Sequence, residues 1–115
     1  ALPASMQLAF SNDAEDANWR QVPERMAYET YRILQETMSN IVRHSNATEV
    51  KIRLSLNDGQ LLLNIDNNGQ ACPAQGGKGI GRITVQERAK AMGGVIVEQY
   101  SDGWQHFSLQ LTYRN

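Results

Sequence analysis

The chain has 115 residues, of which 41% are hydrophobic and 20% are charged, as expected for one globular domain with its own core. Eleven basic and twelve acidic side chains give a net charge of −1, so we expect no nucleic-acid partner. No run of about 18 apolar residues is present to cross a bilayer, so we expect a soluble segment without membrane contact.

The sequence begins without an initiator methionine, so we expect residues 1–115 to be one domain cut from a longer polypeptide. Its single cysteine, Cys72, cannot form an internal disulfide, which agrees with a reducing compartment. Alternation of apolar and polar residues from Met6 to Ser11 predicts a short first strand.

Pro23 has the backbone angle of a first helical turn, and a helix is predicted from about residue 23 through Ser45. Apolar side chains recur there at steps of three and four, which indicates a buried stripe along one helix face. The predicted stripe consists of Ala27, Tyr31, Leu34, Met38 and Ile41.

Two alternating segments follow, from Val50 to Leu56 and from Leu61 to Ile65, and turn residues at 57–59 (NDG) join them into a predicted β-hairpin. After a loop from Asn67 to Lys78, residues 82–92 return to helical spacing and stop at a pair of glycines.

A closing hairpin is predicted from Val95–Tyr100 and Phe107–Leu111, around the turn at 101–103 (SDG). The order is therefore strand, helix, two strands, helix, two strands. This order predicts an α+β fold, a two-layer α/β sandwich in which helices cover one face of a mixed, largely antiparallel sheet.

Polar residues interrupt the first predicted helix at Glu36, Asn40 and Arg43, which share a face roughly opposite the apolar stripe. A carboxylate there can orient or deprotonate a nucleophile, an amide oxygen one turn later can ligate Mg²⁺, and a guanidinium can meet phosphate oxygens. Since Glu29 and Arg32 join the same sector, periodicity alone favours a solvated helix surface with ordinary charge pairs.

Residues 76–81 (GGKGIG) lead directly into the second predicted helix, whose N-terminus can bind an anion. Neither the dinucleotide-binding glycine pattern nor the P-loop pattern occurs in the chain, and a merely flexible loop remains the alternative. Asp66 follows a predicted strand, where its carboxylate can accept a hydrogen bond from an exocyclic amine. A turn residue remains the alternative for Asp66 and for Gly69.

Together these stretches resemble the ATP-binding domain of sensor histidine kinases, within the GHKL superfamily shared with gyrase, the heat-shock chaperone ATPase and MutL. QETMSNIVRHSNA resembles the N box, IDNNG the first glycine box, and GGKGIGRITVQERAKAMGG the second glycine box with its helix. These three motifs resemble the form found in nitrate-sensor, hexose-phosphate-sensor and DesK-like kinases. The resemblance covers residues 24 to about 100 and implies the Bergerat ATP-binding fold.

The resemblance implies ATP and Mg²⁺ as ligands. Glu36 would be the catalytic base or orienting residue, Asn40 would bind Mg²⁺, and Asp66 would bond the adenine amino group. The other residues implied at the nucleotide or its lid are Arg43, Asn67, Gly69, Gly77, Gly79, Ile80, Gly81 and Arg82.

By resemblance, this cytoplasmic domain of a membrane-anchored sensor would transfer the γ-phosphate of ATP to a histidine on its own dimerisation domain, which then serves a response regulator. His44 lies in the N-box-like stretch and is not that acceptor, and Trp104-Gln105 replace the Gly-Thr step common in the family. One alternative is an ATP-dependent regulatory or partner-binding module without kinase chemistry. Another is a degenerate interaction domain that binds no nucleotide.

Overall fold

The computed structural model describes residues 7–12, 19–70 and 80–114, without the side chains of 10–12 and 80–84. The predicted order of helices and strands is confirmed. The elements are β1 (Gln7–Asn12), α2 (Glu24–His44), β2 (Glu49–Asn57), β3 (Gln60–Asn67), α4 (Ile80–Ala91), β4 (Val95–Ser101) and β5 (Trp104–Thr112).

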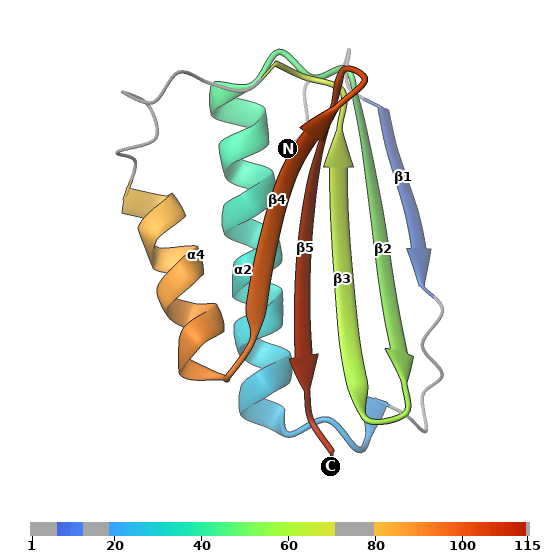
Figure 1. Cartoon of the computed structure of the whole chain (residues 1–115), viewed down its shortest axis with the longest axis vertical. Coiled ribbons are helices and arrows are strands. Elements are labelled where there is room, and N and C mark those ends of the chain that lie inside the picture. The colour runs from blue at the N-terminus through green and yellow to red at the C-terminus, as the bar shows by residue number, and fades with distance from the viewer. Residues whose placement is uncertain (1–6, 13–18, 71–79, 115) are drawn as a thin grey trace.

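The strands form one five-stranded sheet in the order β1-β2-β3-β5-β4. The β1–β2 pair is parallel and the other three pairs are antiparallel. Figure 1 shows α2 and α4 side by side, and residues of both helices share one core cluster with the buried face of the sheet. The two-layer sandwich with a mixed, largely antiparallel sheet is therefore confirmed.

Both predicted hairpins have two-residue turns with left-handed backbone angles. Asp58 and Gly59 have φ values of 51° and 79°, and Asp102 and Gly103 have values of 52° and 80°. Two successive positive φ angles are the requirement of the type I′ turn, whose twist matches that of the strands it joins. The Asp-Gly pairs therefore fix the register of both hairpins.

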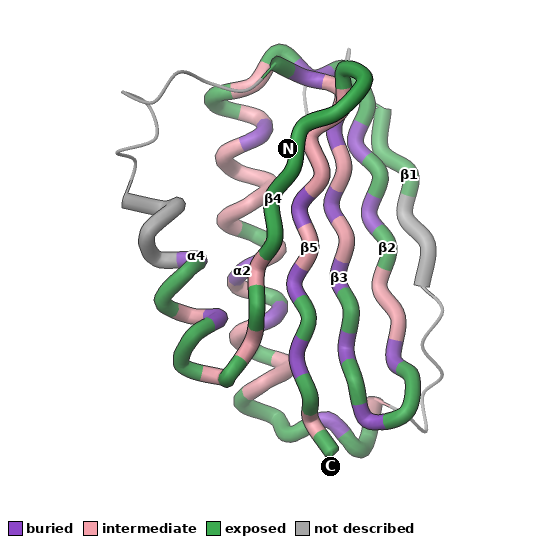
Figure 2. The backbone as a smooth tube through the Cα atoms, viewed as in Figure 1, coloured by how far each residue is buried: buried purple, intermediate pink, exposed green. Residues whose placement is uncertain are grey.

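The core lies between the sheet and the helices, and buried residues alternate with more exposed ones along much of β2, β3 and β5 (Figure 2). Burial of each large aliphatic side chain contributes about 1.5–3 kcal/mol. The most deeply buried are Ile33 from α2, Val50 from β2, Leu61, Leu63 and Ile65 from β3, and Leu109 and Leu111 from β5.

The predicted stripe on α2 is only partly right. Ile41 is buried, but Tyr31 is 55% exposed, and its hydroxyl accepts a hydrogen bond from Gln35 Nε2 at 2.9 Å. Thr30 and Ile33, which the stripe left out, are buried instead. Because α4 packs beside α2, the covered face of α2 is displaced from the predicted stripe toward the polar side chains.

The second helix ends as its glycine pair predicts. Gly93 has a φ of 73°, and the N–H of Gly94 donates to the carbonyl of Ala89 at 2.8 Å, which closes the last turn. Within the described ranges, neither α2 nor α4 combines the length and apolar character that a bilayer span requires.

Candidate functional site

A row of polar side chains runs along α2 next to α4, and we call it the polar stripe: Glu29, Arg32, Glu36, Asn40 and Arg43. In Figure 1, α4 runs alongside α2 in the opposite direction, so its N-terminal end lies toward the C-terminal end of α2. Arg88, near the end of α4, places Nη1 2.6 Å from Glu29 Oε1 and Nε 3.4 Å from Glu36 Oε1. Glu29 and Glu36 are therefore bound to α4, whereas the side chains of an ordinary solvated helix surface contact water.

The Glu36 carboxylate has one oxygen held by cations and one that has no partner among the described residues. Its Oε1 atom lies between Arg88 and Arg32, whose Nη2 is 3.9 Å away. Its Oε2 atom is buried and accepts no hydrogen bond among the described residues. A buried, unpaired carboxylate oxygen is costly, and a bound ion, water or ligand is a common explanation.

Arg88 remains a cation throughout the working pH range. Its pKa is raised above the ordinary value, chiefly by the hydrogen bond to Glu29 and further by the charges of Glu29 and Glu36, while desolvation opposes the shift. The Nε–Oε1 contact with Glu36 is an ion pair, because Nε makes no aligned hydrogen bond to a described residue. Arg88 thus holds Glu36 by charge and Glu29 by a short hydrogen bond.

Asn40 lies one helical turn beyond Glu36 on the same face. Its side chain is partly buried and makes no hydrogen bond to another described residue. Arg43, almost one turn further, is exposed. Oxygen atoms of carboxylates and amides are ligands that Mg²⁺ prefers, so the unpaired Glu36 Oε2 and the Asn40 amide fit a magnesium site, directly or through water.

The end of β3 is fastened to the turn that follows α2. Asn67 Oδ1 accepts hydrogen bonds from Gly69 N at 2.9 Å and Ser45 Oγ at 3.4 Å, and Ser45 Oγ accepts one from Ala47 N at 3.0 Å. A β-carbon on Gly69 would overlap Ser45 Oγ, so this close approach requires glycine. Gln105 Nε2 donates to the Gly69 carbonyl at 3.1 Å, so a residue of the unusual Trp104-Gln105 pair also supports this turn.

Three further hydrogen bonds continue this connection. Asn68 Oδ1 accepts from the backbone N–H groups of Thr48 and Glu49, at 2.8 and 2.9 Å. Asn46 Oδ1 accepts from Gln70 N at 2.7 Å. The strand end and the C-terminal end of α2 therefore form one fixed edge, toward which the polar stripe leads.

Asp66 does not lie with the polar stripe. Asn67 is buried on the helix side, so the alternation of β3 directs Asp66 to the helix-free face. There Asp66 Oδ1 is 3.0 Å from His106 Nδ1 on β5. The expectation that Asp66 shares a pocket with Glu36 and Asn40 is therefore not met.

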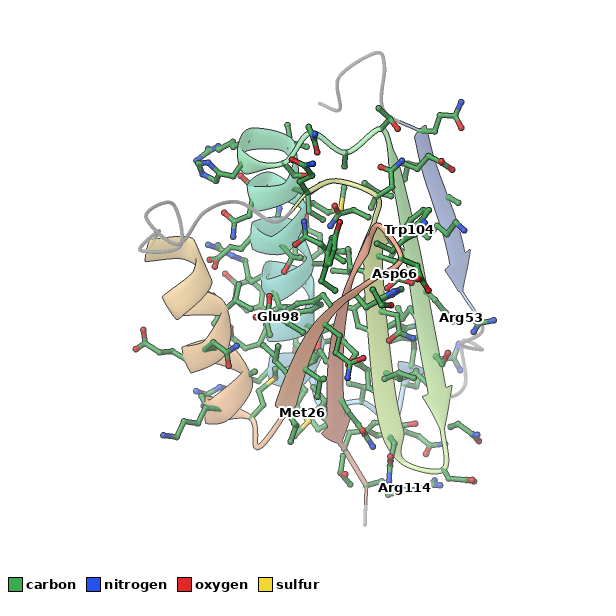
Figure 3. All side chains as sticks on the ribbon, turned by 45° about the horizontal axis from the view of Figure 1, so that its top comes forward. Met26, Arg53, Asp66, Glu98, Trp104 and Arg114 are labelled. Carbon is green, nitrogen blue, oxygen red and sulfur yellow. The ribbon has the colours of Figure 1, made fainter. Side chains whose placement is uncertain are left out.

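The helix-free face has polar features of its own. Lys51 Nζ lies 4.7 Å from the centre of the Trp104 ring, and Figure 3 shows Trp104 and Asp66 toward the same end of β5 and β3. A cavity of about 240 Å³ opens beside Asp66 and His106. Its polar lining includes Asn64, Asp66, Gln99, His106 and Ser108.

Most of the residues predicted to contact the phosphates lie outside the part of the chain that the structure describes or have only their backbone described. Gly77 and Gly79 lie outside the described residues. Ile80, Gly81 and Arg82 form the start of α4, but the described part of the structure includes no side chain for them. Their expected contacts with phosphate remain predictions.

Sequence reasoning gave Arg88 no role in the site and placed Asp66 with Glu36 and Asn40, although Asp66 lies on the helix-free face. The alternation of β3 offered a signal for the second error, because Leu63 and Ile65 point inward, so the next inward position is Asn67. No local pattern signals Arg88, since its contact with Glu29 depends on how α4 packs against α2.

Comparison with known proteins gave matches over most of the chain. A family model described as "Histidine kinase-, DNA gyrase B-, and HSP90-like ATPase" matches residues 27–115. The signal transduction histidine-protein kinase/phosphatase UhpB of Salmonella typhimurium is 28% identical over 108 residues, which are 90% of this chain and 22% of UhpB. The nitrate/nitrite sensor protein NarX of Escherichia coli K12 is 32% identical over 77 residues, which are 65% of this chain and 13% of NarX.

Among solved structures, the histidine kinase domain of the blue-light activated histidine kinase from Erythrobacter litoralis EL346 has a TM-score of 0.79. It is 17% identical, and the alignment covers 96% of this chain and 53% of that one. At this identity the likeness shows the fold alone. The chain spans less than a quarter of the two curated relatives, UhpB and NarX.

Proposed function

Because the chain belongs to the histidine kinase-, DNA gyrase B- and HSP90-like ATPase family, we propose that it transfers the γ-phosphate of Mg-ATP to a histidine on a separate dimerisation domain. The observation that carries this proposal is the pairing of Glu36 and Asn40 on one face of α2. Glu36 offers a buried oxygen without a described partner, and Asn40 offers a partly buried amide that makes no hydrogen bond to another described residue.

In this proposal Glu36 and Asn40 hold Mg²⁺, directly or through its water. When bound, the ion would offset the negative charge of the phosphates. Glu36 also orients the attacking histidine or accepts its proton. Arg88 and Arg32 keep the Glu36 carboxylate in position. Fixed geometry and charge supply most of the catalysis in phosphoryl transfer, so these positioning contacts are part of the proposed machinery.

The phosphates are proposed to lie toward the N-terminal end of α4, where backbone N–H groups and the helix dipole favour anions. The proposed phosphate ligands are Arg43, Gly77, Gly79, Ile80, Gly81 and Arg82. The base is proposed to lie at the strand end beside Asn67 and Gly69. Asp66 is no longer a candidate for this contact, because it faces the other side of the sheet.

The whole-protein role extends beyond this chain. UhpB and NarX are a histidine-protein kinase/phosphatase and a sensor protein, and the chain matches only 22% and 13% of them. We propose that a dimerisation domain elsewhere in the parent carries the acceptor histidine and that a response regulator receives the phosphoryl group. A cytoplasmic location, where ATP is available, is part of the same proposal.

A thermal unfolding titration tests nucleotide binding. Mg-ATP at about 100 times its dissociation constant raises the free energy of unfolding by about 2.7 kcal/mol. A titration without any shift contradicts the proposal and favours the interaction domain that binds no nucleotide. A shift without phosphorylation of an intact parent protein that carries an acceptor histidine contradicts the kinase assignment and leaves the ATP-dependent regulatory module.

A further inference from the structure

Asn67 is a buried polar side chain at the edge of the proposed site. It is only 5% exposed and is the last residue of β3. Its contact with Ser45 places it at the C-terminal end of α2. Asn40 precedes Ser45 by five residues, or about 7–8 Å along the helix axis, so Asn67 stands beyond the proposed magnesium ligands. A base attached to phosphates at Asn40 would extend toward this strand end.

The orientation of the Asn67 amide is fixed by its partners. The N–H of Gly69 can only donate, so the atom 2.9 Å from it must be the carbonyl oxygen Oδ1. Ser45 Oγ accepts from Ala47 N, which leaves its own proton to donate to Oδ1 at 3.4 Å. Both lone pairs of Oδ1 are therefore engaged inside the protein.

The remaining hydrogen-bonding atom of Asn67 is Nδ2, which only donates. It makes no hydrogen bond to another residue in the described part of the chain. A ligand at this edge therefore meets a donor, and it pairs best when it presents an acceptor. The exocyclic amine of adenine is a second donor, whereas the oxo group at C6 of hypoxanthine or guanine is an acceptor.

We propose that Asn67 determines base specificity through Nδ2 and that the site prefers a 6-oxopurine nucleotide to ATP. This inference rests on the proposed nucleotide-binding function and narrows its substrate class. Asp66, the only carboxylate adjacent in sequence, cannot supply the missing acceptor because it is bonded to His106 on the helix-free face. ATP still binds through its phosphates and magnesium, without a hydrogen bond from Asn67 to its amine.

The test compares inosine triphosphate with ATP, both with Mg²⁺, by calorimetric titration of the chain. Inosine triphosphate is expected to bind roughly fivefold to tenfold tighter, the effect of one satisfied hydrogen bond. Equal affinities, or tighter ATP, would overturn the inference while leaving nucleotide binding intact. If neither triphosphate binds, the proposed function fails and the inference fails with it.

Asn67→Asp replaces the donor with an acceptor and is expected to reverse the preference in favour of ATP. The matched variant Asp66→Asn changes the neighbouring residue on the other face and is expected to keep the wild-type preference. An unchanged preference in Asn67→Asp, or a changed one in Asp66→Asn, contradicts the assignment.

A ligand series in the unmodified chain keeps the test decisive if Asn67→Asp does not fold. Purine riboside triphosphate carries only hydrogen at C6, so it neither accepts from Nδ2 nor opposes it with a donor. The expected order of affinity is inosine triphosphate, then purine riboside triphosphate, then ATP. Any other order overturns the inference.

Discussion

Arg88 Nε on α4 lies 3.4 Å from Glu36 Oε1 on α2, and Nη1 of the same guanidinium lies 2.6 Å from Glu29 Oε1. This arrangement links the carboxylate proposed to work on the phosphoryl group to the helix that begins beside the glycine-rich segment. A displacement of α4 would therefore also displace the partner of Glu36. The predictions below treat Arg88 as a positioning residue and Glu36 as a catalytic one.

Replacement of Arg88 by methionine keeps much of the aliphatic stem but removes both ion pairs. Phosphorylation of the acceptor histidine in the parent protein is expected to slow on the order of tenfold to a hundredfold, because Glu36 loses its orientation. The affinity for Mg-ATP is expected to change much less. Single-turnover phosphorylation and calorimetric titration measure the two quantities separately.

Lys90→Met is the control for this variant, because Lys90 is an exposed cation in the same last turn of α4. It is expected to phosphorylate at the wild-type rate. If both variants lose the same fraction of the phosphorylation rate, only the net charge of α4 matters. If Arg88→Met alone loses much of its affinity for ATP, Arg88 contacts the ligand.

Glu36→Gln keeps the shape of the side chain and removes its charge. The rate of histidine phosphorylation is expected to fall by at least about a hundredfold, the lower range for loss of a positioned acid or base. Glu24→Gln, in the exposed first turn of the same helix, is expected to have no effect. A Glu36→Gln protein with wild-type kinetics would remove Glu36 from the mechanism.

Asn40→Ala removes the amide that is proposed to bind magnesium. Nucleotide binding in the presence of Mg²⁺ is expected to weaken by about 1–2 kcal/mol, whereas binding in EDTA changes little. Asn64→Ala, on the helix-free face, should leave both titrations unchanged. If Asn40→Ala weakens binding equally with and without the metal, its role is not metal binding.

Gly69→Ala tests the fixed edge between β3 and α2. Its β-carbon would overlap Ser45 Oγ and come within 2.8 Å of Ala47 N, so the free energy of unfolding is expected to fall by about 2–3 kcal/mol. The measurement is denaturant unfolding with a constant slope.

Gly103→Ala separates this clash from backbone strain. Gly103 has a φ of 80° but no atom within 4 Å of an added β-carbon. Gly103→Ala is therefore expected to lower the free energy of unfolding by only about 1–2 kcal/mol, the strain of a left-handed alanine. Equal destabilisation by the two substitutions would mean that the approach of Ser45 to Gly69 is not tight.

Local patterns were sufficient to predict the architecture. The Asp-Gly turns, the alternation of the flanking strands and the glycine pair after α4 act between near neighbours in sequence, so the sequence displays them directly. Tyr31 was misplaced because its neighbours alone do not determine which side of α2 is covered. That choice depends on α4, which packs against α2 from a distant part of the chain.

The candidate site was predicted less completely, for two different physical reasons. The chemistry of its carboxylate predicts Asp66 beside Glu36 and Asn40, whereas strand alternation, which the sequence also displays, puts Asp66 on the face opposite Asn67. The link between Arg88 and Glu29 depends on helix packing across 59 residues and has no signature in either helix alone.

The central claim is that a nucleotide-bound divalent ion lies between Glu36 and Asn40 on α2. Substitution of Mg²⁺ by paramagnetic Mn²⁺ in the presence of ATP tests it directly by NMR, through the broadening of assigned side-chain amide signals. We predict that the Asn40 side-chain amide broadens strongly while that of Asn64, on the opposite face of the sheet, stays sharp. Broadening of Asn64 without broadening of Asn40, or of neither amide, would contradict the claim.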